Sequence, residues 1–231
     1  KINVRQVSYL VLIVVAVFFL FFYQNKEKGP DMSNAAYITN QGTVHGTYYR
    51  VTYQSPDSID LHTGITETFQ AFENSLSVFK SNSIISRINQ NDPDVIVDDY
   101  FKTVFETAQE ISEITGGAFD MTVAPLVNAW GFGFEKTDKV TPQLIDSLRQ
   151  MVGYRKVSLS GNKLIKEDPR IMLDASAIAK GYSCDVIAQY LESKGVINYL
   201  VDIGGEIRAK GVNSKGNFWR VGINKPIENE T

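Results

Sequence analysis

An uninterrupted run of hydrophobic residues near the N-terminus is the feature that most restricts how this chain can fold. It comprises fifteen residues, Tyr9 to Tyr23. Such a run is shorter than the ~20 residues of an ideal membrane span, but it crosses a bilayer with local thinning or snorkelling of its flanks. Lys1 and Arg5 precede the run and the charges after it are mixed, which favours the N-terminus inside and the following domain outside. We predict an uncleaved transmembrane signal anchor over residues 1–24, with a buried core helix as the alternative.

Charge and cysteine content exclude several classes of function. The net charge of the 231 residues is −3, so no basic field draws in a nucleic acid, and we predict no nucleic-acid partner. Cys184 is the single cysteine, which rules out an intramolecular disulfide. It falls in a predicted helix, and we interpret it as a small buried hydrophobe. His45 and His62 are the only histidines, which excludes a multi-histidine metal centre.

Hydrophobic periodicity predicts an α+β fold with a largely antiparallel sheet and packed helices. Residues 25–41 are polar and are predicted to be a linker, and the alternation from Thr43 to Gln54 predicts one strand. Apolar residues at spacings of four and three predict a helix stripe from Ile65 to Phe79. Further helices are expected near residues 84–88, 101–111, 141–153 and 176–194, and strands near 157–159, 163–165, 171–173, 196–201, 206–210 and 219–223. Helices and hairpins are segregated along the chain, which favours α+β over a doubly wound parallel fold.

The segment Leu173–Tyr182 joins a predicted strand to a predicted helix. Asp174 can cap free backbone N–H groups there, with Lys180 simply solvated. A second interpretation starts from Ala175, Ser176, Ala177 and Ala179, which leave the backbone bare. A bare helix N-terminus attracts phosphate through its free N–H groups and its dipole, and Lys180 would add a movable positive charge. Local sequence leaves both interpretations open.

Two other glycine-rich stretches admit an ordinary and a functional interpretation. The first contains Gly116–Asp120 and Trp130–Gly133. In the ordinary interpretation, the glycines end a helix and Trp130 is a core residue. In the functional interpretation, the glycines let the flat ring of a ligand approach the main chain. The second is Asp202–Glu206, which by itself predicts only a bulge or turn.

Taken together, these segments resemble the ApbE-type flavin transferases, the FAD:protein FMN transferases. The likeness covers about residue 42 to the end, which we take as the domain, 42–231. Seven segments occur in order at compatible spacing: residues 42–47, 76–79, 83–89, 117–120, 124–133, 173–181 and 203–206.

The resemblance implies a deep FAD-binding cleft and a magnesium ion. In that family, magnesium helps transfer the FMN half of FAD to a threonine of a target protein, and AMP leaves. Positions matched by motif imply FAD contacts from Ala118, Phe119, Asp120, Asp174, Lys180, His45 and Phe79. The family often has methionine where His45 stands and tyrosine where Phe79 stands. Ala177 matches a metal-ligand position, and it has no side-chain oxygen, so its backbone carbonyl would be the ligand.

The resemblance also implies partners and a location. The expected targets are flavoprotein subunits of membrane redox complexes, and the expected location is the bacterial inner membrane with the domain in the periplasm. The family's later Thr-Ser-Gly, His-x-Ile-Asp-Pro and Asp-x-x-x-Thr segments do not occur, so we expect a C-terminally truncated domain that holds magnesium poorly. A FAD pyrophosphatase that gives FMN and AMP, and a non-catalytic membrane-tethered flavin-binding protein, are the alternatives.

Overall fold

The computed structural model describes residues 35–56, 58–133 and 140–223. The predicted anchor, residues 1–24, lies outside the described residues. The strands are β1 (Tyr37–Val44), β2 (Thr47–Gln54), β3 (Val157–Ser160), β4 (Lys163–Lys166), β5 (Tyr199–Ile203) and β6 (Glu206–Lys210). The helices are α2 (His62–Leu76), α3 (Ile84–Asn89), α4 (Asp99–Ile114), α5 (Ala124–Ala129), α6 (Pro142–Arg149) and α7 (Ser176–Ser193), with a 3-10 turn at Tyr154–Lys156.

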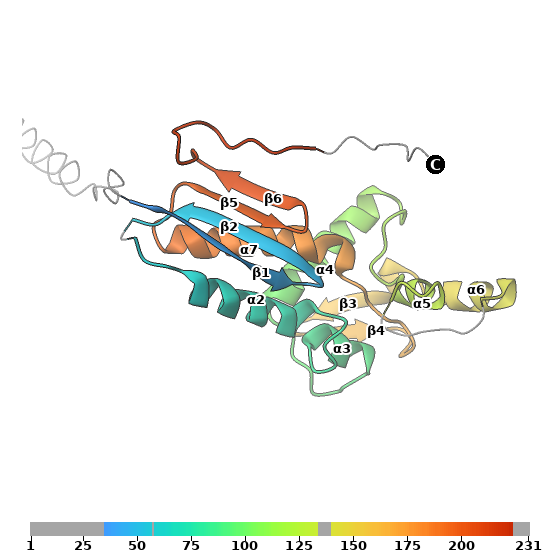
Figure 1. The fold of residues 1–231 in the computed structure, drawn as a ribbon. Coiled ribbons are helices and arrows are strands. Elements are labelled where there is room, and N and C mark those ends of the chain that lie inside the picture. The colour runs from blue at the N-terminus through green and yellow to red at the C-terminus, as the bar shows by residue number, and fades with distance from the viewer. Residues whose placement is uncertain (1–34, 57, 134–139, 224–231) are drawn as a thin grey trace, which may run out of the picture.

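The main sheet has the strand order β1-β2-β5-β6, and every neighbouring pair is antiparallel. Helices α2 and α7 cover one face of this sheet (Figure 1). Strands β3 and β4 form a separate antiparallel hairpin. The α+β prediction with a largely antiparallel sheet is therefore confirmed. Among the described residues, no helix is both long and apolar enough to cross a membrane.

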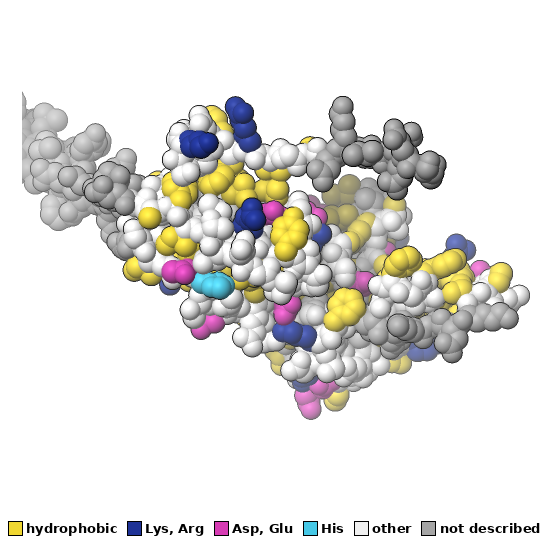
Figure 2. All heavy atoms as spheres, viewed as in Figure 1, with side chains coloured by type: hydrophobic (Ala, Val, Ile, Leu, Met, Phe, Trp, Pro, Cys, Tyr) yellow, Lys and Arg dark blue, Asp and Glu magenta, His cyan; other side chains and the backbone are white. Residues whose placement is uncertain are grey.

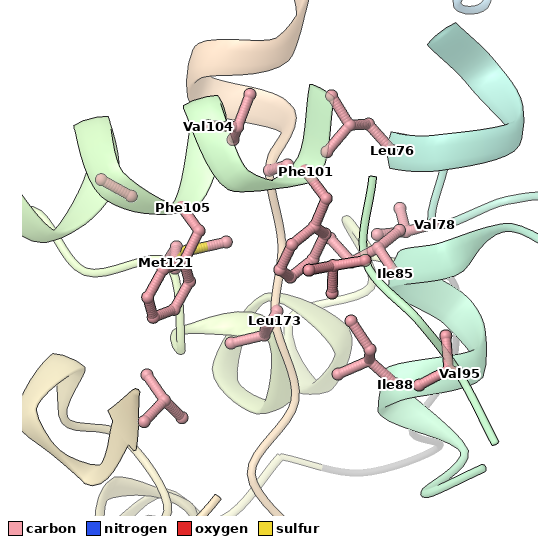
Figure 3. Packing of buried hydrophobic residues seen from close by; sticks show 14 of the residues in the cluster. Leu76, Val78, Ile85, Ile88, Val95, Phe101, Val104, Phe105, Met121 and Leu173 are labelled. Atoms are coloured by element: carbon pink, nitrogen blue, oxygen red, sulfur yellow. The ribbon is translucent and has the colours of Figure 1, made fainter. Parts of the chain in front are cut away.

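Two apolar clusters hold these layers together. One lies between the sheet and helices α2 and α7, and it contains Cys184, which is 2% exposed, as predicted. The other joins α2, α3 and α4 to the segment that leads into α7 (Figure 3). Phe101 and Leu173 are fully buried in this second cluster. Complete burial of such a side chain contributes roughly 1.5–3 kcal/mol, so the start of α7 is anchored to the core.

The predicted helices form where caps and periodicity coincide. Asp98 accepts the backbone N–H of Phe101 and begins α4. Thr141 accepts the N–H of Leu144 and begins α6, with Pro142 at the first helical position. Each cap satisfies an N–H group that would otherwise have no partner in the helix.

The strand predicted from Thr43 to Gln54 is confirmed over Thr47–Gln54, which is β2, but its first four residues belong to a hairpin that joins β2 to an additional strand. Strand β1 begins at Tyr37, inside the segment predicted to be a linker, and pairs with β2 across a two-residue turn. The turn residues His45 and Gly46 have φ of 52° and 72°, as a type I′ hairpin turn requires. Strand β1 is at the sheet edge, and four of its eight residues are exposed. Its polar composition therefore resembles that of a linker.

Two other expected strands and one expected helical residue also differ. Residues 171–173 form only a single parallel bridge, between Met172 and Val123, and residues 219–223 belong to no strand. Helix α2 ends at Leu76, so Phe79 lies in the following turn and is 72% exposed. The apolar stripe continues past the helix, but the backbone becomes extended at Ser77.

The face of the sheet away from α2 and α7 is not covered by any described helix. Figure 2 views this face and shows hydrophobic side chains among acidic and basic ones. Tyr48 and Ile207 are exposed there because alternate residues of a strand point to opposite faces.

Candidate functional site

The candidate site lies at one end of the main sheet, where two hairpin turns meet the ends of two helices. Tyr49 of β2 pairs with Ile203 of β5 in antiparallel register. This register places the β1–β2 turn and the β5–β6 turn at the same end of the sheet. Gly204 in the second turn donates its N–H to the carbonyl oxygen of Tyr48 at 3.0 Å and ties the two turns together.

A cavity of about 260 Å³ opens at this end. Its walls come from the β1–β2 turn, the C-terminal part of α2, the turn after α2 and the N-terminal part of α7. The lining residues are His45, Phe72, Glu73, Leu76, Ser77, Val78, Phe79, Ser176, Ala179 and Lys180. Most walls are apolar, and Glu73 and Lys180 carry charge. The structure thus brings together three predicted site residues from distant parts of the sequence: His45, Phe79 and Lys180.

Lys180 supplies a positive charge on the first turns of α7. Its Nζ lies 3.4 Å from the carbonyl oxygen of Gly204 and 3.7 Å from Oε1 of Glu206. Its side chain is 38% exposed, so these contacts hold the ammonium loosely. A loosely held ammonium beside a helix N-terminus is suited to bind a phosphate that enters the cavity.

Glu73 is a residue of the cavity that sequence reasoning missed. Its Oε1 accepts the backbone N–H of His45 at 3.3 Å and lies 3.5 Å from Nδ1 of that ring. Nζ of Lys80 lies 2.8 Å from its Oε2. Burial opposes ionisation of Glu73, but the hydrogen bonds from Lys80 and His45 prevail and lower its pKa. An acid on the flank of a helix stripe carries no local signal of this role.

His45 lies in the wall of the cavity, where its surroundings disfavour protonation of the ring. Burial lowers its pKa, and the neighbouring Glu73 opposes this shift only in part. The ring packs against Phe69 and Phe72, with ring centroids 5.9 and 5.5 Å away. Its Nε2 is buried and has no hydrogen-bond partner among the described residues.

The second group of predicted residues, Ala118 to Asp120, directly precedes Met121, which contacts the backbone of Asp174. The N–H of Asp174 donates to the carbonyl oxygen of Met121 at 2.8 Å. The Asp120 carboxylate accepts the N–H and hydroxyl of Thr122 at 2.8 and 2.6 Å and the N–H of Tyr154 at 2.7 Å. The Asp120 carboxylate therefore joins its own loop, through Thr122, to the 3-10 turn that begins at Tyr154.

Asp174 itself behaves as an acid at a helix start. Its Oδ1 accepts the N–H of Ser176 at 2.8 Å, although the cap position is held by Ala175. None of Ala118, Phe119, Asp120 or Asp174 lines the cavity. Their contacts with FAD stay predictions.

Ala177 lies on the first turn of α7, between cavity residues Ser176 and Ala179. Its carbonyl oxygen belongs to the hydrogen-bond ladder of an α-helix, which directs it along the helix axis. In the described part of the chain, no three His, Cys, Asp or Glu side chains gather in a group that could hold a metal ion. The role of Ala177 as a metal ligand stays a prediction.

The fold is an α+β domain with a cavity that has apolar and aromatic walls and contains the ammonium group of Lys180. Comparison with known proteins is more specific: the chain belongs to the ApbE family, whose family model matches residues 45–231. The predicted resemblance is thereby confirmed.

Relatives and solved structures agree with this assignment. A FAD:protein FMN transferase of Vibrio cholerae serotype O1 is 40% identical over 193 residues, which are 80% of this chain and 58% of the relative. One from Haemophilus influenzae is 39% identical over 204 residues, covering 82% and 59%. The structure of flavin transferase ApbE from Vibrio cholerae matches with a TM-score of 0.78 and 38% identity, covering 83% of this chain and 65% of that one. Pseudomonas stutzeri flavinyl transferase ApbE, in its apo form, matches with a TM-score of 0.74 and 29% identity, covering 82% and 66%. The chain spans 58% and 59% of the length of these two curated relatives.

Proposed function

We propose that this protein is an FAD:protein FMN transferase, which moves the FMN half of FAD to a threonine of a target protein and releases AMP. The observation that carries the proposal is the cavity in which Lys180 and the N-terminal part of α7 face apolar and aromatic walls. Family membership and the names of the relatives support it.

The residues of the cavity have complementary roles in this proposal. Lys180 and the N-terminal N–H groups of α7 bind the pyrophosphate. Phe79 stands exposed at the rim and packs on a ring of the ligand, an interaction worth about 0.5–1.5 kcal/mol beyond burial. Phe72, Leu76 and Val78 form the apolar wall.

The transfer itself is an in-line displacement at phosphorus. The threonine hydroxyl oxygen of the target attacks the phosphorus of the FMN half and forms a new P–O ester bond. The P–O bond to the bridging oxygen breaks, AMP leaves with that oxygen, and the hydroxyl proton passes to solvent or to a base. Lys180 offsets the charge that develops on the phosphate oxygens.

Magnesium is part of the proposal through the family resemblance. When bound, this hard cation offsets charge on the pyrophosphate and on the leaving AMP. The backbone carbonyl of Ala177 is the one ligand that the resemblance assigns within this chain. A chelator that abolishes transfer, with recovery on addition of Mg²⁺, is the expected result.

The proposal includes a location and a class of partner. The apolar run from Tyr9 to Tyr23 and the charges before it support an inner-membrane anchor with the domain in the periplasm. Flavoprotein subunits of membrane redox complexes are the proposed targets. The topology is tested by introducing a cysteine after residue 40 and labelling it from each side of the membrane in turn. Native Cys184 is buried and leaves a low background.

Incubation of the full-length protein with FAD, Mg²⁺ and a target bearing the acceptor threonine tests the activity. In-gel flavin fluorescence on the target supports the transferase, and a target without the threonine is the control. Free FMN without labelled target would identify a FAD pyrophosphatase. Intact bound FAD without turnover would identify a flavin-binding protein.

A further inference from the structure

Asn89 makes an unusual contact with the segment that leads into α7. It is the last residue of α3 and is 8% exposed. Its Nδ2 donates to the carbonyl oxygen of Leu173 at 2.9 Å, and its Oδ1 accepts the N–H of the same residue at 2.8 Å. One side chain thus satisfies both backbone groups of a fully buried residue, as a neighbouring strand would.

The opposite side of this segment is held by main-chain contacts. The N–H of Asp174 donates to the carbonyl oxygen of Met121, and Met172 forms a parallel bridge with Val123. The chain from Met172 to Asp174 therefore lies between the Asn89 amide and the loop that follows Asp120. No described strand takes the place of Asn89 beside it.

The segment continues directly into the cavity. Ala175 is buried in the same core cluster, and α7 begins at the next residue, Ser176. Ser176 and Lys180 both line the cavity. Because a helix is stiff, a displacement of its first turn also displaces Lys180.

A buried backbone donor or acceptor that loses its hydrogen-bond partner destabilises the structure, because it has given up water without a replacement. Removal of the Asn89 amide would leave the backbone N–H and carbonyl oxygen of Leu173 buried without hydrogen-bond partners. The segment would then move to reach water or other partners, and the start of α7 would move with it.

We propose that Asn89 is a positioning residue for FAD binding: by pairing with both backbone groups of Leu173, it fixes the start of α7 and hence the position of Lys180 in the cavity. The inference rests on the proposed function, because it names what determines the geometry of that same site. Asn89 does not contact the ligand in this scheme.

The test compares Asn89→Ala with a matched control, Asn198→Ala, in the full-length protein. Asn198 also uses its amide twice, donating to Oε1 of Gln54 at 2.8 Å and accepting the N–H of Val212 at 2.9 Å. It precedes β5, at the end of that strand opposite the cavity. The measurements are the melting temperature, the dissociation constant for FAD by calorimetry, and separate KM and kcat values for FAD and for the target protein.

We expect both variants to have a lower melting temperature than the wild type. Only Asn89→Ala should also lose FAD affinity and turnover. Its dissociation constant for FAD should rise about tenfold and its turnover should fall by about ten- to a hundredfold, while KM for the target stays unchanged. Asn198→Ala should bind FAD within about twofold of the wild type. If Asn89→Ala, measured well below its melting temperature, binds FAD as tightly as Asn198→Ala, the inference is wrong.

Asn89→Asp provides a second readout that also serves if Asn89→Ala does not fold. A carboxylate accepts the N–H of Leu173 but repels its carbonyl oxygen, whereas a protonated carboxyl accepts one and donates to the other. The ratio of the FAD dissociation constants, variant to wild type, should therefore fall as the pH is lowered from about 8 to about 5, since burial raises a carboxyl pKa. A ratio of one at all pH values overturns the inference. A wild type that does not bind FAD refutes the proposed function instead.

Discussion

Substitution of Lys180 by glutamine separates the role of its charge from the stability of the fold. The side chain is 38% exposed, and Glu206, its partner at 3.7 Å, is 51% exposed. An ion pair of this kind contributes at most about 1 kcal/mol to stability. Glutamine is also a good helix former, so α7 should persist.

The effect on the ligand should be larger. A hydrogen bond from an ammonium to a phosphate is worth about 1.5–3 kcal/mol. Its loss should raise the dissociation constant for FAD by about ten- to a hundredfold. The difference in FAD affinity between Lys180→Gln and the wild type should be smaller at high salt, because screening weakens the ammonium–phosphate contact in the wild type.

Isothermal titration of FAD, with thermal unfolding of the same samples, measures both quantities. Lys210→Gln is the matched control, because Lys210, on β6 and away from the cavity, forms a similarly solvent-exposed ion pair with Glu192 of α7. It should bind FAD as the wild type does. If Lys180→Gln binds FAD as tightly as Lys210→Gln, the assignment of Lys180 to the phosphate site is refuted.

Three further outcomes are expected. Burial raises the pKa of Cys184 to about 12, so a thiol reagent at neutral pH should label it only after denaturation; rapid labelling of the native protein would contradict its placement. Burial holds the pKa of His45 below its ordinary 6.5, so the unfolded chain protonates first and the free energy of unfolding should fall as the pH drops below about 6.5. Urea titrations across that pH range should show that the free energy of unfolding depends less steeply on pH in His45→Gln than in the wild type. Equal pH dependence in both proteins would count against a lowered pKa of His45. Gly204→Ala should lose more stability than Gly205→Ala in urea, since both have positive φ but only the first would place a Cβ 2.6 Å from Cγ2 of Thr47. The positive φ alone costs roughly 1–2 kcal/mol, and similar losses for both variants would show that the turn relaxes.

Local patterns predicted most helices and part of the site. The spacing of apolar residues, with capping residues such as Asp98 and Thr141, was sufficient because helix hydrogen bonds join residues four apart. The motifs marked Lys180, His45 and Phe79, which the structure places around one cavity. The edge strand β1 was missed because an exposed strand has no apolar face to reveal it.

The sequence by itself determined the α+β class, the helices and the family. Only the tertiary structure decided that Glu73 binds the backbone of His45 and that Asn89 takes the place of a strand beside Leu173. These pairs are 28 and 84 residues apart. A periodic pattern reports which face of an element is buried, whereas a hydrogen bond between distant segments depends on how the packed core brings them together.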